Sequence, residues 1–113
     1  MAELWLMQNL LETAVNRARQ LGAHHIHEIK IQIGAASDVT PESLAQAFEV
    51  VKNGTIAQDA HLHSEYLPIV CYCATCNVEF QPIDPLYQCP ECHQPYCEIR
   101  QGQELELNDL EIS

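Results

Sequence analysis

The chain has 113 residues, enough for one compact domain or for a domain with a small second lobe, and a formal net charge of −11. Its five basic residues do not cluster, which disfavours nucleic acid and anionic membranes as partners. No apolar run approaches the about 20 residues of a membrane span, and no signal peptide is visible. We expect a cytoplasmic protein whose partners are proteins or cations.

The first half of the chain predicts a helix, a strand and a second helix. Residues 3–21 place apolar side chains at helical spacing. Residues 26–34 (IHEIKIQIG) alternate isoleucine with polar residues, which predicts a half-buried strand. Thr40 and Pro41 are typical of a helix start, as N-cap and first helical residue, and Asn53-Gly54 ends that helix.

The second half predicts two more strands. Residues 60–70 (AHLHSEYLPIV) form the first of them, with Pro68 indicating an edge or a strand end. Residues 103–112 form the last one, and the step of three from Leu107 to Leu110 indicates a bulge at Asn108-Asp109. The predicted fold is α+β: two helices on a small three-stranded sheet, with a four-cysteine zinc-ribbon-like lobe inserted before the last strand.

Four of the six cysteines form two Cys-x-x-Cys knuckles separated by 12 residues. Each knuckle can place two thiolates on one side of a tight turn, so that two knuckles supply four sulfurs in a tetrahedron. A closed site of this kind leaves the metal no open position for a substrate. We therefore predict a structural zinc ion with four ligands, Cys73, Cys76, Cys89 and Cys92.

Iron and disulfides are the alternatives for these thiols. Cys-Pro-x-Cys also occurs in rubredoxin-like iron sites, but those usually carry glycine after the knuckle, where this chain has Asn77 and His93. Disulfides are disfavoured because thiols stay reduced in the cytoplasm.

The two other cysteines, Cys71 and Cys97, flank the knuckles. They are either small buried residues at the base of the lobe or alternative ligands for a soft metal. We place the zinc-binding lobe at residues 71–97 and an α/β domain at residues 1–70 plus 98–113.

Five of the six histidines form two groups, one before the first strand (His24, His25 and His27) and one on a single face of the second (His61 and His63). They are either solvated or packing side chains, or a site for a borderline metal such as nickel, copper or zinc. No histidine has a convincing nucleophile or acid partner, so the sequence predicts that the chain is not an enzyme.

Several segments together resemble one known family over essentially the full length of the chain. They are the two knuckles and the stretches ELWLMQNLLETA, IKIQIGAASDVTPESLAQAFEVV and GQELELNDLEI. The chain resembles the HypA/HybF family of hydrogenase nickel incorporation proteins. The resemblance implies a nickel metallochaperone that helps insert Ni²⁺ into [NiFe]-hydrogenase, with structural zinc and with nickel as transient cargo. It implies the HypB GTPase and the hydrogenase large subunit as partners, and a monomer or a dimer, in which protomers can exchange elements.

The first residues depart from the family pattern. Family members usually begin Met-His-Glu, and their nickel site uses the terminal amine, the second residue's amide and its imidazole. Here Met1, Ala2 and Glu3 stand at the matching positions, so the imidazole is missing and we expect the nickel site to be impaired. The alternative function is a zinc-stapled protein-interaction adaptor without nickel delivery.

Overall fold

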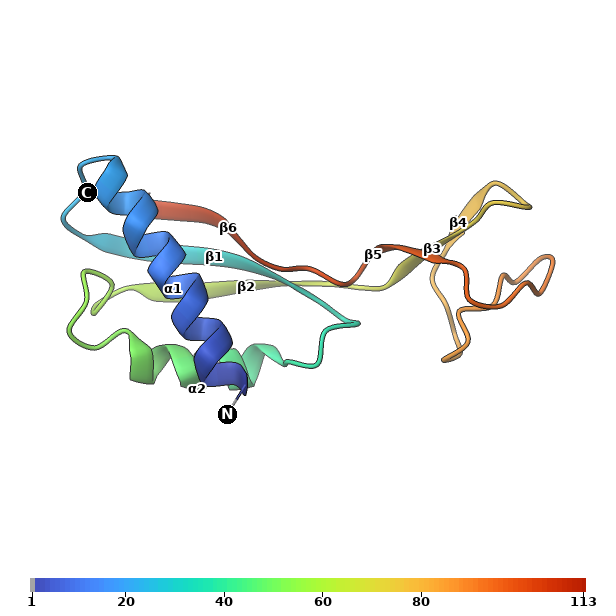
Figure 1. The fold of residues 1–113 in the computed structure, drawn as a ribbon, viewed down its shortest axis with the longest axis horizontal. Helices are drawn as coiled ribbons and strands as arrows, with labels where there is room; N and C mark the ends of the chain where they lie inside the picture. The colour runs from blue at the N-terminus through green and yellow to red at the C-terminus, as the bar shows by residue number, and fades with distance from the viewer. Residues whose placement is uncertain (1) are drawn as a thin grey trace.

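The computed structural model describes residues 2–113, which form two small sheets arranged end to end along a molecule of 54 × 28 × 16 Å (Figure 1). The helices are α1 (Ala2–Gln20) and α2 (Pro41–Val51). The strands are β1 (Ile26–Gly34), β2 (His61–Leu67), β3 (Val70–Cys73), β4 (Val78–Phe80), β5 (Glu98–Gln101) and β6 (Leu105–Ile112). The first sheet has the order β2-β1-β6 and the second the order β4-β3-β5, which confirms the predicted α+β fold.

β1 is the central strand of the first sheet because its alternating sequence gives it one apolar face. Ile29, Ile31 and Ile33 are fully buried on that face, as their spacing predicts. β2 pairs with β1 in parallel and β6 pairs with it in antiparallel orientation, so the sheet is mixed.

Both helices pack on the isoleucine face of the first sheet, and α1 crosses in front of it in Figure 1. Met7 and Leu11 of α1 and Leu44 and Phe48 of α2 are buried in this core. Among residues 2–113, no helix is long and apolar enough to cross a membrane. The opposite face of the sheet, which we call the open face, carries the polar side chains of the three strands.

The start of α2 is fixed by a reciprocal cap. The backbone N–H of Ser43 donates to Thr40 Oγ1 over 3.1 Å, and the backbone N–H of Thr40 donates to Ser43 Oγ over 3.2 Å. Pro41 is the first helical residue, where its missing N–H costs nothing. The predicted cap is confirmed, and α2 ends two residues before Asn53.

The predicted bulge in the last strand is also present. Lys30 pairs with Asp109 while Ile31 pairs with Leu107, so Asn108 is the extra residue. The bulge lets Leu107 and Leu110 both contact the core although they are three residues apart.

The predicted strand 60–70 is wrong in its extent, because the chain divides it between the two sheets. β2 ends at Leu67 and β3 begins at Val70, with Pro68 between them. Proline cannot donate a ladder hydrogen bond, and β2 is an edge strand that ends directly before Pro68, as this residue indicated.

Two glycines make a close backbone contact where the first sheet meets the second. The Gly34 N–H donates to the carbonyl oxygen of Glu104 over 2.7 Å, and the Ala36 N–H donates to that of Gly102, also over 2.7 Å. A Cβ atom on Gly34 would lie 2.0 Å from the Gly102 oxygen, so no side chain fits there.

The division of the chain at residues 71 and 97 stays a prediction. The second sheet reaches from residue 70 to residue 101.

We expect Gly34→Ala to lower the free energy of unfolding by about 3 kcal/mol, because backbone atoms must move to admit the methyl group. Urea denaturation of the zinc-loaded protein, followed by circular dichroism, measures this loss. Gly22→Ala is the matched control. Gly22 has a positive φ of 78° but open space around its Cβ position, so that variant should lose only about 1 kcal/mol. Equal losses in the two variants would contradict the tight contact at Gly34.

Candidate metal centre

The two knuckles meet at the far end of the second sheet. The Sγ atoms of Cys73 and Cys92 are 3.5 Å apart, and those of Cys89 and Cys76 are 4.0 Å apart. All four sulfurs lie within 4.8 Å of one another. A tetrahedron of sulfurs around zinc, with bonds of about 2.3 Å, has edges of about 3.8 Å. The cluster is therefore consistent with a structural zinc site.

Local backbone conformation directs the four sulfurs inward. Asn77 and His93, which follow the second cysteine of each knuckle, have positive φ angles of 54° and 63°. This left-handed conformation turns the chain back after each knuckle. The Thr75 hydroxyl donates to Gln94 Oε1 over 2.7 Å and so joins the first knuckle to the segment after the second. The Glu91 N–H also donates to the Cys89 sulfur over 3.4 Å.

The thiols have unequal acidity in this arrangement. The backbone N–H of Cys76 lowers the pKa of Cys73 to about 7, so that thiol ionises readily near neutral pH. The hydrogen bond with Cys92 raises the pKa of Cys76 to about 12. Because four adjacent thiolates repel one another, a bound cation is needed to hold them all in the charged form.

Cys71 and Cys97 lie outside this group of four. Cys71 is completely buried in β3, and burial raises the pKa of its thiol. The Cys97 thiol donates to the carbonyl oxygen of Gln94 over 3.3 Å, and burial and then the neighbouring Cys73 raise its pKa. For Cys71, these surroundings fit a packing residue better than a metal ligand.

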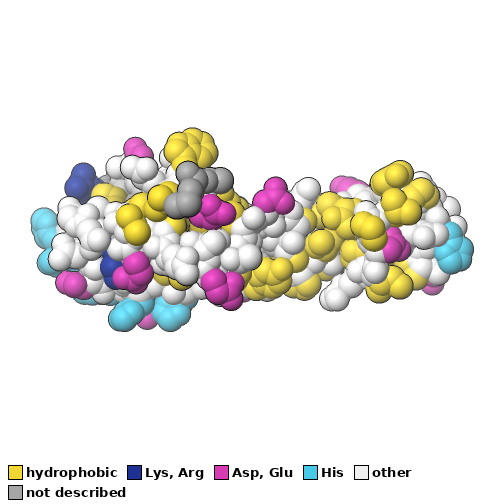
Figure 2. All heavy atoms as spheres, turned by 90° about the horizontal axis from the view of Figure 1, so that it is seen from below, with side chains coloured by type: hydrophobic (Ala, Val, Ile, Leu, Met, Phe, Trp, Pro, Cys, Tyr) yellow, Lys and Arg dark blue, Asp and Glu magenta, His cyan; other side chains and the backbone are white. Residues whose placement is uncertain are grey.

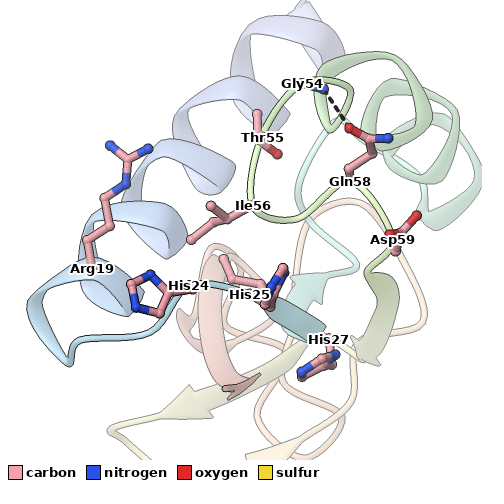
Figure 3. Close-up of a pocket in the computed structure, with 10 residues that line it drawn as sticks. Arg19, His24, His25, His27, Gly54, Thr55, Ile56, Gln58 and Asp59 are labelled. Carbon is pink, nitrogen blue, oxygen red and sulfur yellow. Dashed lines mark hydrogen bonds between the residues drawn. The ribbon is translucent and has the colours of Figure 1, made fainter.

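The histidines between α1 and β1 do not converge on one point. His24 and His25 line a cavity together with Arg19 and Asp59, and Figure 3 shows their rings pointing in different directions. The ring centroids of His25 and His27 are 6.4 Å apart, and His27 Nε2 lies 2.6 Å from the Ser113 hydroxyl. Within residues 2–113, the four cysteines form the one group with metal-ligand spacing. The geometry favours solvated histidines here.

His61 and His63 both lie on the open face of the first sheet, as their spacing predicted. His63 Nε2 lies 3.1 Å from the Glu28 Oε1 atom of the neighbouring strand. Sequence reasoning did not single out Glu28, because only the strand register brings it beside a histidine 35 residues away.

The residues of the predicted nickel site lie at the start of α1. Met1 is outside the described residues, Ala2 begins the helix, and Glu3 is in its first turn. Glu3 lines a shallow cavity with Ser43 and Gln46 of α2. In Figure 1 this end of α1 lies beside α2, part-way along the molecule, whereas the second sheet with the knuckles lies at one end of the long axis.

A family model for hydrogenase/urease nickel incorporation metallochaperones, HypA, matches residues 1–112. The chain belongs to the HypA family. It is 40% identical over 112 residues to the hydrogenase maturation factor HypA of Picosynechococcus sp., covering 99% of each protein. It is 35% identical to the same factor of Chloroflexus aurantiacus, covering 98% of each. The resemblance predicted from the sequence is confirmed.

A solved structure supports the assignment at the level of the fold. The solution structure of the Ni metallochaperone HypA from Helicobacter pylori superposes with a TM-score of 0.73 at 27% identity. The alignment covers 97% of this chain and 96% of that one. The HypA family consists of metallochaperones for hydrogenase maturation and not of enzymes, so the prediction of a non-enzymatic protein is confirmed.

Replacing any one of Cys73, Cys76, Cys89 and Cys92 with alanine should abolish stoichiometric zinc binding. Structural zinc contributes on the order of 10 kcal/mol to the folding of a small site, so the loss should also loosen the second sheet. Elemental analysis of the purified variants measures the zinc content per chain.

The flanking cysteines supply the controls for this experiment. Cys71→Ala and Cys97→Ala should each keep one zinc ion per chain. Loss of zinc from Cys71→Ala as complete as that from Cys76→Ala would contradict the ligand assignment.

Proposed function

We propose that this chain carries Ni²⁺ in the cytoplasm and helps insert it into the large subunit of [NiFe]-hydrogenase. The observation that carries the proposal is the match to the HypA family over residues 1–112. In this proposal nickel is the transient cargo. Zinc bound by Cys73, Cys76, Cys89 and Cys92 is structural, because a closed four-sulfur site exchanges no ligand during delivery.

The proposed nickel site consists of the terminal amine of Met1 and the amide nitrogens of Ala2 and Glu3. Nitrogen donors of this kind suit square-planar Ni²⁺. The methyl group of Ala2 offers no donor where the family has an imidazole. We therefore propose that nickel binds here more weakly than in relatives with histidine at this position.

The placement of the site supports separate roles for the two metals. Glu3 lies beside α2 in the part of the molecule that holds the first sheet, whereas the four cysteines lie with the second sheet at one end of the long axis. A change at residue 2 can therefore alter nickel binding without disturbing the cysteine cluster.

The proposed partners are the HypB GTPase and the hydrogenase large subunit. A net charge of −11 favours a basic protein surface over nucleic acid as the partner. We propose that the chain acts as a monomer or as a dimer, in which protomers can exchange elements. The alternative, a zinc-stapled adaptor without nickel delivery, rests on the missing imidazole at Ala2.

Ala2→His should strengthen nickel binding by roughly tenfold or more, about 1.4 kcal/mol per decade, because it restores an imidazole donor. Calorimetric titration of the zinc-loaded protein with NiCl₂ measures the affinity, after mass spectrometry has verified the first residue. Ala2→Leu is the control, since it changes size without adding a donor. Zinc content should stay the same in all three proteins. If the unmodified chain already binds Ni²⁺ as tightly as Ala2→His, the N-terminal site is not the principal one.

Immobilised protein should capture purified HypB or a hydrogenase large-subunit precursor, and should bind no RNA at physiological salt. The physical reason is the acidic surface, which repels phosphates and attracts basic protein patches. Surface plasmon resonance at several salt concentrations measures both interactions. Tight, salt-sensitive RNA binding would overturn the partner proposal. HypB capture by a chain that never binds nickel would favour the adaptor.

A further inference from the structure

The open face of the first sheet brings acidic and histidine side chains from three strands together. In the strand register, Glu28 of β1 lies opposite His61 of β2 on one side and Glu111 of β6 on the other. Figure 2 views the molecule from below, with this face along its lower edge, where histidine and acidic side chains gather. Since both helices occupy the other face, these side chains are open to solvent.

Two of these side chains are in contact, and a third is their neighbour in the strand register. His63 Nε2 lies 3.1 Å from Glu28 Oε1, and its side chain is 54% exposed. On the other side, Glu111 of β6 is the register partner of Glu28. The neighbouring Glu111 and then His63 lower the pKa of Glu28, while the neighbouring Glu28 raises the pKa of Glu111.

Two like charges placed directly opposite on neighbouring strands destabilise a sheet. In this sheet the nearby Lys30 lowers the pKa of both Glu28 and Glu111 and so offsets part of the repulsion between them. A divalent cation would offset it more completely, because it can neutralise both carboxylates at once. The like-charged pair thus favours a bound cation, independently of the histidine beside it.

The donor set selects the class of cation. One imidazole and two carboxylates suit a borderline first-row ion such as Ni²⁺, Co²⁺ or Zn²⁺. Mg²⁺ and Ca²⁺ prefer oxygen ligands alone, and Cu⁺ prefers thiolates.

We propose that Glu28, His63 and Glu111 bind a borderline divalent cation on the open face, at a site separate from both the cysteine cluster and the N-terminus. This site does not require the proposed nickel-delivery function. It would give this chain an imidazole donor for nickel, which position 2 lacks.

Cation binding requires a local rearrangement of exposed side chains. Among residues 2–113, only the cysteines already hold three donor atoms within 4.8 Å of one another. His63 and Glu111 must therefore rotate toward Glu28 to reach a common ion. Both are exposed, so the rotation moves no packed neighbour. Lys30, which pairs with His63 and Asp109 in the register, competes with the ion and limits its affinity.

Titration of the zinc-loaded, ¹⁵N-labelled full chain with NiCl₂ tests this site by NMR. High-spin Ni²⁺ bound by oxygen-rich ligands is paramagnetic and broadens nearby amide signals, whereas square-planar Ni²⁺ at an amine and amide site is diamagnetic. We expect broadening centred on the amides of residues 28, 63 and 111. His63→Ala and Glu28→Gln should each weaken this binding by about tenfold or more.

Two matched controls use the same strands and the same face. His61→Ala removes an imidazole from β2, and Glu106→Gln removes a carboxylate from β6, but neither changes a proposed ligand. Both should bind Ni²⁺ within about twofold of the unmodified chain. Circular dichroism of all four variants verifies that the first sheet stays folded.

The outcomes separate this site from the nickel-delivery proposal. Broadening confined to His24 and His25, or none at all, overturns the open-face site and leaves an N-terminal nickel site intact. Equal weakening by His61→Ala and His63→Ala also overturns the assignment. Open-face broadening that His63→Ala abolishes supports the site, even in a chain that delivers no nickel to hydrogenase.

Discussion

The alternation of side chains along β1 is the constraint on which both faces of the first sheet depend. Ile29, Ile31 and Ile33 must be buried, so both helices pack on their side, and Glu28 and Lys30 are left on the other. β6 can follow this alternation only because the bulge at Asn108 brings its leucines back to the apolar face. The same register sets the carboxyl of Glu111 beside that of Glu28. The hydrophobic core and the polar cluster on the open face are therefore two results of one pairing.

Those parts of the fold that depend on local sequence could be predicted. Thr40 and Pro41 specify a helix start within a few residues, and the step from Leu107 to Leu110 reveals the bulge without knowledge of its partner strand. The spacing of the cysteines in the two knuckles is likewise visible in the sequence alone. These features need no information about which distant segments meet.

Features that depend on strand pairing were missed. Glu28, His63 and Glu111 come from three strands, and only the parallel β1–β2 pairing and the antiparallel β1–β6 pairing bring them together. The contact between Gly34 and Gly102 joins residues 68 positions apart, so neither glycine stands out in the sequence. Residues 60–70 read as a single strand because β-propensity continues across Pro68, although the chain passes there from one sheet to the other.

The two kinds of metal environment in this chain suit opposite tasks. In the cysteine cluster, Cys73 and Cys89 are fully buried, and a metal held by four sulfurs leaves only when the lobe opens. On the open face, His63 and Glu111 are exposed, and an ion there can exchange ligands with water or with a partner protein without any opening of the core. A cargo ion has to be released, so it belongs on an exposed and weakly binding surface. A zinc ion in the cysteine cluster would stabilise the second sheet, whereas the proposed nickel cargo would suit donors at the N-terminus or on the open face.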